Sequence, residues 1–184
     1  MTQKAPFAHL FRVADLAGRK PTRFTLTPGP AERAAIAVEL GLLDLPELAF
    51  TGELRPVGRG DWLLEAALSA RVVQPCVVTL APVVTSISED VTRRYLTDLP
   101  EPEGDDVEIP EDDTVEPLAS VIDAGHVMTE ALALALPLYP RAADAGFDDL
   151  QVTEPGKSAL LDEDLRPFAN LANLLKRKDE RRDD

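Results

Sequence analysis

Apolar and polar positions along the chain change their period twice. Residues 30–42 carry apolar side chains at helical spacing, begin with a proline suited to the first helical position and end beside a glycine, which predicts a helix. Residues 47–57 and then 62–72 alternate between apolar and polar side chains. Because the Gly-rich turn at residues 58–61 separates these two runs, they predict a β-hairpin.

The rest of the pattern adds two strands and two helices. Residues 76–80 are β-branched and strand-like, and residues 84–95 continue the alternation after a proline bend. Leucines alternate near residues 132–138, yet the intervening alanines and an aspartate N-cap favour a helix over residues 123–136. A last helix is predicted over residues 167–178. The predicted fold is therefore α+β, an antiparallel β-sheet packed by about three helices.

Charge changes this picture in one segment. The chain holds 33 acidic and 19 basic residues, and its formal net charge of −14 opposes general nucleic-acid binding. Nine carboxylates gather in residues 101–116, which predicts a flexible acidic loop. They are Glu101, Glu103, Asp105, Asp106, Glu108, Glu111, Asp112, Asp113 and Glu116. We expect this loop to contact a cationic partner; a merely solubilising insertion is the alternative.

Basic residues concentrate at the two ends of the sequence. The first 23 residues carry five, namely Lys4, Arg12, Arg19, Lys20 and Arg23, and the last predicted helix ends with Lys176, Arg177 and Lys178. These groups support a second hypothesis, in which the protein binds RNA directly through its N-terminal segment and C-terminal helix. A steep loss of RNA affinity with salt would separate it from protein contact.

Side chains for catalysis or metal binding are scarce. Cys76 is the single cysteine, so no intrachain disulfide forms, and one thiol with two histidines does not supply the usual four zinc ligands. We therefore expect no metal and no cofactor. A small-molecule enzyme using Cys76 is a third and weaker hypothesis, because the residue lies in an apolar stretch and is expected to be a buried structural thiol. A non-enzymatic protein of the cytoplasm, without membrane segment or signal peptide, is predicted.

Three stretches, taken in order, resemble one known family. They are CVVTLAPV at residues 76–83, IDAGHVMTEAL at 122–132 with LPLYPR at 136–141, and PFANLANLLK at 167–176. Together they resemble the YceD family of large ribosomal RNA subunit accumulation proteins, and most closely its alphaproteobacterial branch. The residues that carry the resemblance are Cys76, Thr79, Pro82, Asp123, Glu130, Pro137, Pro140 and Phe168.

The resemblance implies a bacterial cytoplasmic protein needed for accumulation of 23S ribosomal RNA, and it transfers no catalytic residue. Many members carry a Cys-x-x-Cys pair at the first stretch, whereas Val73 stands three positions before Cys76 here. The implied organisation is a single YceD-like domain over residues 1–178, with the acidic loop inserted at 101–116 and a disordered tail at 179–184. A ribosomal protein or a pre-50S particle is the expected partner, RNA contact is possible, and the oligomeric state is left open.

Overall fold

The computed structural model describes residues 7–99 and 114–146. In chain order, the elements are β1 (Leu10–Arg12), a 3-10 turn (Val13–Asp15), β2 (Thr22–Leu26), α1 (Pro30–Glu39), β3 (Asp44–Val57), β4 (Asp61–Pro75), β5 (Pro82–Leu96), β6 (Val115–Pro117), β7 (Val121–Asp123) and α2 (Ala124–Ala135). All of them belong to one compact unit that ends at Ala145. The α+β class predicted from the sequence is confirmed.

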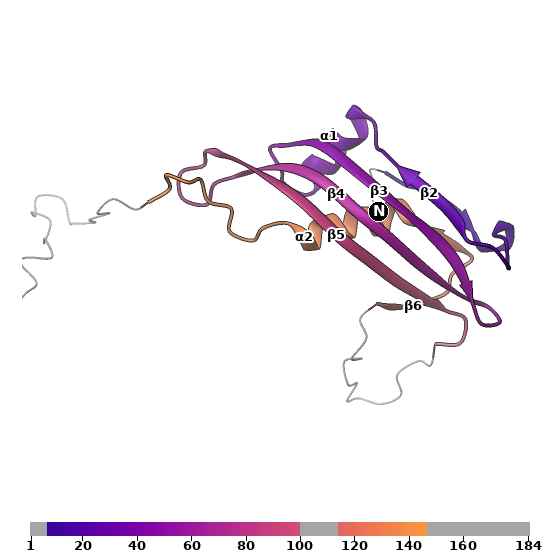
Figure 1. Ribbon diagram of the computed structural model, residues 1–184. Helices are drawn as coiled ribbons and strands as arrows, with labels where there is room; N and C mark the ends of the chain where they lie inside the picture. The colour runs from indigo at the N-terminus through magenta and orange to yellow at the C-terminus, as the bar shows by residue number, and fades with distance from the viewer. Residues whose placement is uncertain (1–6, 100–113, 147–184) are drawn as a thin grey trace, which may run out of the picture. The chain divides into compact units, whose positions relative to one another are not determined.

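A five-stranded sheet with the order β2-β3-β4-β5-β6 forms the body of this unit (Figure 1). Strands β3, β4 and β5 pair antiparallel, as predicted, and β2, which the sequence pattern did not predict, pairs antiparallel with β3. The hairpin between β3 and β4 turns where Gly58 takes a positive φ of 60°. Strand β6 instead pairs parallel to β5, with Arg94 opposite Val115. A separate two-stranded sheet joins β1 to β7.

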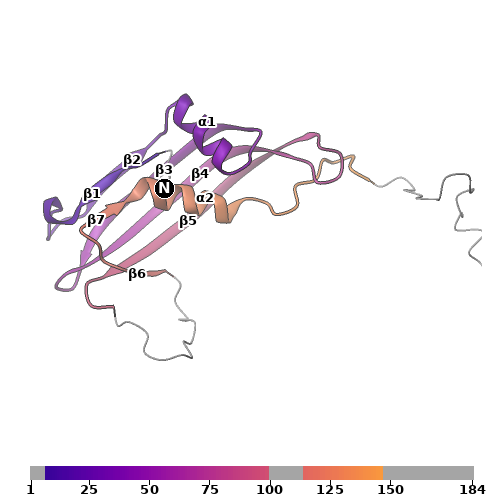
Figure 2. The ribbon, with the colours of Figure 1, turned by 180° about the vertical axis from the view of Figure 1, so that it is seen from behind.

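One face of the large sheet is covered and holds the core. Alternation along β4 buries every second side chain on this face, namely Trp62, Leu64, Ala66, Leu68, Ala70 and Val72. In β3, Leu48, Phe50 and Leu54 follow the same rule, as the sequence pattern predicted. Helix α2 lies across this face (Figure 2) and adds Val127, Met128 and Leu132 to the same cluster. Burial of these apolar side chains provides the main stabilisation of the sheet against α2.

A glycine in the middle of β3 permits close contact with β4. Gly52 lies opposite Phe24 of β2 and Ala66 of β4. A Cβ atom at this position would overlap the Glu65 carbonyl and the Ala66 side chain. The centroids of the Phe24 and Phe50 rings lie 5.7 Å apart, and Phe24 is the residue of β2 that pairs with Gly52. Close strand approach thus depends on the missing side chain.

Two predicted elements differ from the structure. Helix α1 ends at Glu39 instead of residue 42, since Gly41 takes a φ of 66° and cannot continue the helix. Its buried residues are Ile36 and Ala37, whereas Val38, one of the apolar side chains at helical spacing in residues 30–42, is 82% exposed. The strand predicted at residues 76–80 is wrong, because the chain forms a turn there.

Helix α2 agrees with the prediction for residues 123–136, and the alanines outweigh the alternating leucines. Three predictions lie outside the described residues: the helix at 167–178, the tail at 179–184 and most of the acidic loop.

Candidate functional site

The turn between β4 and β5, residues 76–81, is organised around a sulfur atom. The backbone N–H groups of Val78 and Thr79 donate to Cys76 Sγ at 3.4 and 3.5 Å. The Cys76 N–H donates to the Ala81 carbonyl at 2.8 Å, and the Leu80 N–H donates to the Cys76 carbonyl at 2.9 Å. Because these groups bond within the turn, they are not available to a neighbouring strand. Local hydrogen bonding therefore overrides the β-branched composition that predicted a strand here.

The segment after α2, residues 137–142 and here named the strap, is bonded to this cysteine turn. The Ala142 N–H donates to Cys76 Sγ at 3.4 Å, and the Val77 N–H donates to the Pro140 carbonyl at 3.0 Å. Gln74 Nε2 also donates to the Pro137 carbonyl at 3.3 Å. Five residues that carried the family resemblance thus lie in the turn, in the strap or at the start of β5: Cys76, Thr79, Pro82, Pro137 and Pro140.

The hydrogen bonds at Cys76 stabilise its charged form. The Thr79 side chain, followed by the Ala142 and Thr79 backbone N–H groups, lowers the pKa of the thiol to about 6, although burial acts in the opposite direction. Cys76 has no exposed surface, which confirms the expected buried thiol. The hydrogen bonds from the turn and the strap thus favour the thiolate over the thiol, on a sulfur atom that has no exposed surface.

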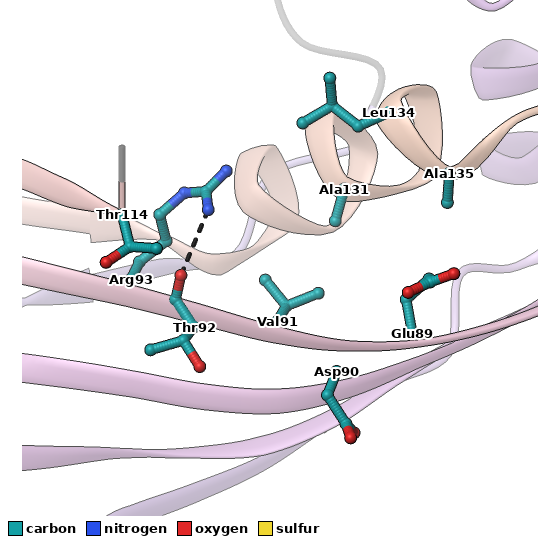
Figure 3. A pocket seen from close by; sticks show the side chains of 9 residues that line it. All are labelled: Glu89, Asp90, Val91, Thr92, Arg93, Thr114, Ala131, Leu134 and Ala135. Carbon is teal, nitrogen blue, oxygen red and sulfur yellow. Dashed lines mark hydrogen bonds between the residues drawn. The ribbon is translucent and has the colours of Figure 1, made fainter. Parts of the chain in front are cut away.

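A second candidate site lies between β5 and α2 and centres on Arg93, whose side chain is 14% exposed. The Arg93 guanidinium contacts Glu116 of β6 at 3.3 Å and Glu130 of α2 at 3.4 Å. It also donates to the Thr92 carbonyl at 3.2 Å, the dashed line in Figure 3. Glu116, predicted as a loop residue, is instead part of strand β6, because Val115 and its neighbours complete the sheet beside β5.

A pocket of about 510 Å³ opens beside Arg93. Residues 89–93 of β5 line one side with Thr114, and Ala131, Leu134 and Ala135 of α2 line the other. In Figure 3, Glu89, Val91 and Arg93 point toward the helix, whereas Asp90 points to the opposite side of the strand. Leu134 is 75% exposed, so the pocket combines an apolar helix edge with carboxylates on the strand.

Asp123 joins the start of α2 to the N-terminal part of the unit. Its Oδ1 accepts hydrogen bonds from the Gly125 and His126 backbone N–H groups at 2.9 and 3.2 Å, which confirms the predicted N-cap. The same oxygen accepts a third bond, from the His9 backbone N–H at 2.9 Å. The N-cap was predictable from the sequence, but the contact with His9 spans 114 positions and left no local signal.

The remaining predicted site residues are divided between the surface and the segments that the structure does not describe. Arg12, Arg19, Lys20 and Arg23 are all exposed, and Arg23 lies 3.4 Å from Glu53. Lys4, Phe168, the eight carboxylates from Glu101 to Asp113 and the C-terminal basic residues lie outside the described ranges. Within residues 7–99 and 114–146, no group of three or more His, Cys, Asp or Glu side chains is placed to hold a metal ion. No helix in these ranges is long and apolar enough to cross a membrane.

The chain thus contains an α+β domain in which residues far apart in the sequence meet at a cysteine turn and at the partly buried Arg93. A model of the family described as large ribosomal RNA subunit accumulation protein YceD matches residues 64–175. The protein belongs to the YceD family, and the match includes the cysteine turn, the strap, Arg93 and both of its carboxylate partners. Searches among curated proteins and among solved structures gave no match.

Proposed function

We propose that this protein is a non-enzymatic factor for large ribosomal subunit biogenesis that supports accumulation of 23S ribosomal RNA through contact with a basic ribosomal protein or a pre-50S particle. The observation that carries the proposal is membership of a family named for large ribosomal RNA subunit accumulation. The contact surface that we assign is the acidic run at residues 101–116. A cytoplasmic location follows from the partner and agrees with a free thiol at Cys76.

The described ends of the acidic run support this assignment. The run leaves the sheet after β5 and returns at β6, where Val115 pairs with Arg94 and Glu116 contacts Arg93. Both attachment points therefore belong to a structured part of the molecule. Carboxylates attached there present a concentrated negative charge to a cationic surface, which raises the association rate and makes it sensitive to salt.

Direct RNA binding is the second candidate function. Arg12, Arg19 and Lys20 are exposed, and none has an ion-pair partner among the described residues. The net charge of −14 opposes this mode. Titration of purified protein with ribosomal RNA at increasing salt distinguishes the two: a steep linear fall of log affinity with log salt concentration supports RNA binding through these cations.

Neutralising part of the acidic run tests the main proposal. The variant carries Glu103→Gln, Asp105→Asn, Asp106→Asn, Asp112→Asn and Asp113→Asn, which removes five of the nine carboxylates. In a strain that lacks the natural gene, we expect less co-purifying ribosomal protein and less 23S relative to 16S RNA. A matched control removes five carboxylates elsewhere on the surface: Asp15→Asn, Glu39→Gln, Glu47→Gln, Glu53→Gln and Asp144→Asn.

The control is expected to retain both signals, because surface charges and ion pairs at the surface, such as those of Glu47 and Glu53, contribute little to stability. A folded variant of the acidic run with normal 23S levels and unchanged co-purification would show that this segment only improves solubility.

A further inference from the structure

Within residues 7–99 and 114–146, no strand lies beside most of one edge of β5. Residues Pro82 to Tyr95 of β5 pair with β4, whereas only Arg94 to Leu96 pair with β6. Figures 1 and 2 show β6 beside one end of β5. The remainder, residues 82–93, is therefore a sheet border of the kind to which a further chain can pair.

The hydrogen bonds at β6 establish which backbone groups face outward. The Arg94 N–H donates to the Thr114 carbonyl, and the Leu118 N–H donates to the Leu96 carbonyl, both at 2.8 Å. Even-numbered residues of β5 thus direct their N–H and C=O groups away from β4. At Val84, Ser86, Ser88 and Asp90 these groups have no hydrogen-bond partner within residues 7–99 and 114–146.

The open edge ends at a defined position. Arg93 donates to the Thr92 carbonyl, one of the outward groups, and so occupies the edge where β6 begins. Ser86, Ser88, Asp90 and Thr92 are exposed, so solvent now meets these backbone positions. An added strand would consequently lie along residues 84–91, in line with β6.

The charges along this edge favour a basic segment. Glu89, Asp90, Glu116 and Glu130 supply four carboxylates, against the two guanidinium groups of Arg93 and Arg94. Arg93 already contacts two of them, whereas Glu89 and Asp90 have no cation partner among the described residues. In Figure 3 Glu89 points toward α2 and Asp90 to the other side, so two adjacent residues of an added strand would each face one acid.

From this geometry we infer that the edge of β5 at residues 84–91 binds an extended, basic segment of a protein partner as an additional antiparallel or parallel strand. Two consecutive Lys or Arg residues lie opposite Glu89 and Asp90, and an apolar residue follows beside Ala131 and Leu134. Backbone hydrogen bonds supply affinity, and the acids with the apolar helix edge supply selectivity. The basic nature of the partner rests in part on the proposed function.

A second copy of this chain is the other occupant to consider, because exposed edges also pair with themselves. Pairing two β5 edges would add the Glu89 and Asp90 carboxylates of one copy to those of the other. Like charges placed opposite each other across strands are destabilising. The charge of the edge therefore favours a basic segment over self-association.

Peptide binding to the full-length protein tests the inference without any readout of ribosomal RNA. The probe is a fluorescein-labelled peptide TVTKRVTVT, measured by fluorescence anisotropy, with TVTEEVTVT as the charge control. Two further peptides have the TVTKRVTVT sequence with N-methyl groups on alternate backbone amides. One peptide is methylated on the odd-numbered residues and the other on the even-numbered residues, so each has one of its two edges blocked for strand pairing. We expect TVTKRVTVT to bind at least about tenfold more tightly than TVTEEVTVT. Only one of the two methylated peptides should lose binding, because an added strand pairs with β5 through one of its edges.

Two protein variants locate the binding site. Ser88→Pro removes an outward N–H while leaving the bonds to β4, and should weaken the probe by about three- to tenfold, the equivalent of one lost hydrogen bond. Glu89→Gln with Asp90→Asn should weaken it by a similar factor. The control, Glu47→Gln with Glu53→Gln, removes two carboxylates of β3 and should leave affinity unchanged.

The inference would be overturned if the two methylated peptides bound with equal affinity, or if TVTKRVTVT and TVTEEVTVT did. Sedimentation that shows a dimer broken by Ser88→Pro would assign the edge to self-association and overturn it as well. If Ser88→Pro does not fold, the methylated peptides and the charge variant still decide the matter on folded protein. If the wild-type protein does not bind the basic peptide while the variant of the acidic run still lowers 23S accumulation, only the inference about this edge is contradicted. If the wild-type protein binds the peptide while the variant of the acidic run leaves 23S accumulation unchanged, only the proposed function is contradicted.

Discussion

The Arg93 guanidinium lies 3.4 Å from the Glu130 carboxylate and thereby joins the last third of β5 to helix α2. Its replacement by a long apolar side chain, Arg93→Met, leaves Glu130, Glu116 and the Thr92 carbonyl without their shared donor. We expect the free energy of unfolding in urea to fall by about 1–3 kcal/mol. Arg71→Met is the control, because that pair with Glu47 is long, at 3.8 Å, and exposed. A control loss equal to that of Arg93→Met would contradict a special role for Arg93.

Asp123→Ala should destabilise the protein by about 1–2 kcal/mol, because one oxygen caps α2 and also binds the His9 N–H. Asp123→Asn retains an acceptor oxygen and should recover most of this loss. Hydrogen exchange provides the local measurement: the amides of His9, Gly125 and His126 should exchange faster in the alanine variant. Unchanged exchange at His9 would mean that the carboxylate caps the helix only.

Gly52→Ala should lower the free energy of unfolding by about 1–3 kcal/mol, since the new methyl group overlaps the Glu65 carbonyl and the Ala66 side chain. Gly18→Ala is the matched control, because a Cβ there meets nothing within 4 Å. Thermal unfolding of the two variants under one condition compares them directly. Equal midpoints would show that β3 and β4 move apart at little cost.

Cys76 should make stability depend on pH. The pKa of its thiol is about 6 in the folded protein and near 9 when unperturbed. Between pH 6 and pH 9 the unfolded state therefore keeps the thiol proton that the folded state has lost. The thiolate therefore stabilises the fold fully above pH 9, and this contribution disappears as pH falls to 6. Relative to Cys76→Ser, the wild-type free energy of unfolding should rise between pH 6 and 9 and stay level below pH 6.

The thiolate absorbance in the ultraviolet, taken as wild type minus Cys76→Ser, measures the folded pKa directly. A midpoint near the unperturbed value would contradict the hydrogen bonds to Sγ. Alkylation should nevertheless be slow at pH 7, because the sulfur has no exposed surface.

The long strands were predictable because their side chains alternate over many residues. In β4 the pattern from Trp62 to Val72 matches burial at every second position, and β3 follows it. The short strands carried no such signal: β1, β6 and β7 have three residues each, and pairing with distant segments determines them. Composition even favoured a loop at Glu116, although Val115 pairs with Arg94 of β5.

At the candidate sites, local and distant contributions separate in the same way. The cap at Asp123 follows from local chemistry, whereas the cysteine turn requires the Ala142 N–H, which lies 66 positions away. A sulfur atom as the acceptor of several backbone N–H groups was not apparent from an apolar stretch of sequence. The sites therefore follow from tertiary contacts more than from motifs.

The pairing of β1 with β7 also constrains how the chain acquires its structure during synthesis. Phe11 pairs with Ile122, so the N-terminal strand has no partner until more than a hundred further residues have been made. The hairpin of β3 and β4 depends only on neighbouring residues and is complete long before that. During translation, β1 therefore pairs only after β7 has been made. Helix α2, which Asp123 caps, packs onto the sheet at the same late step.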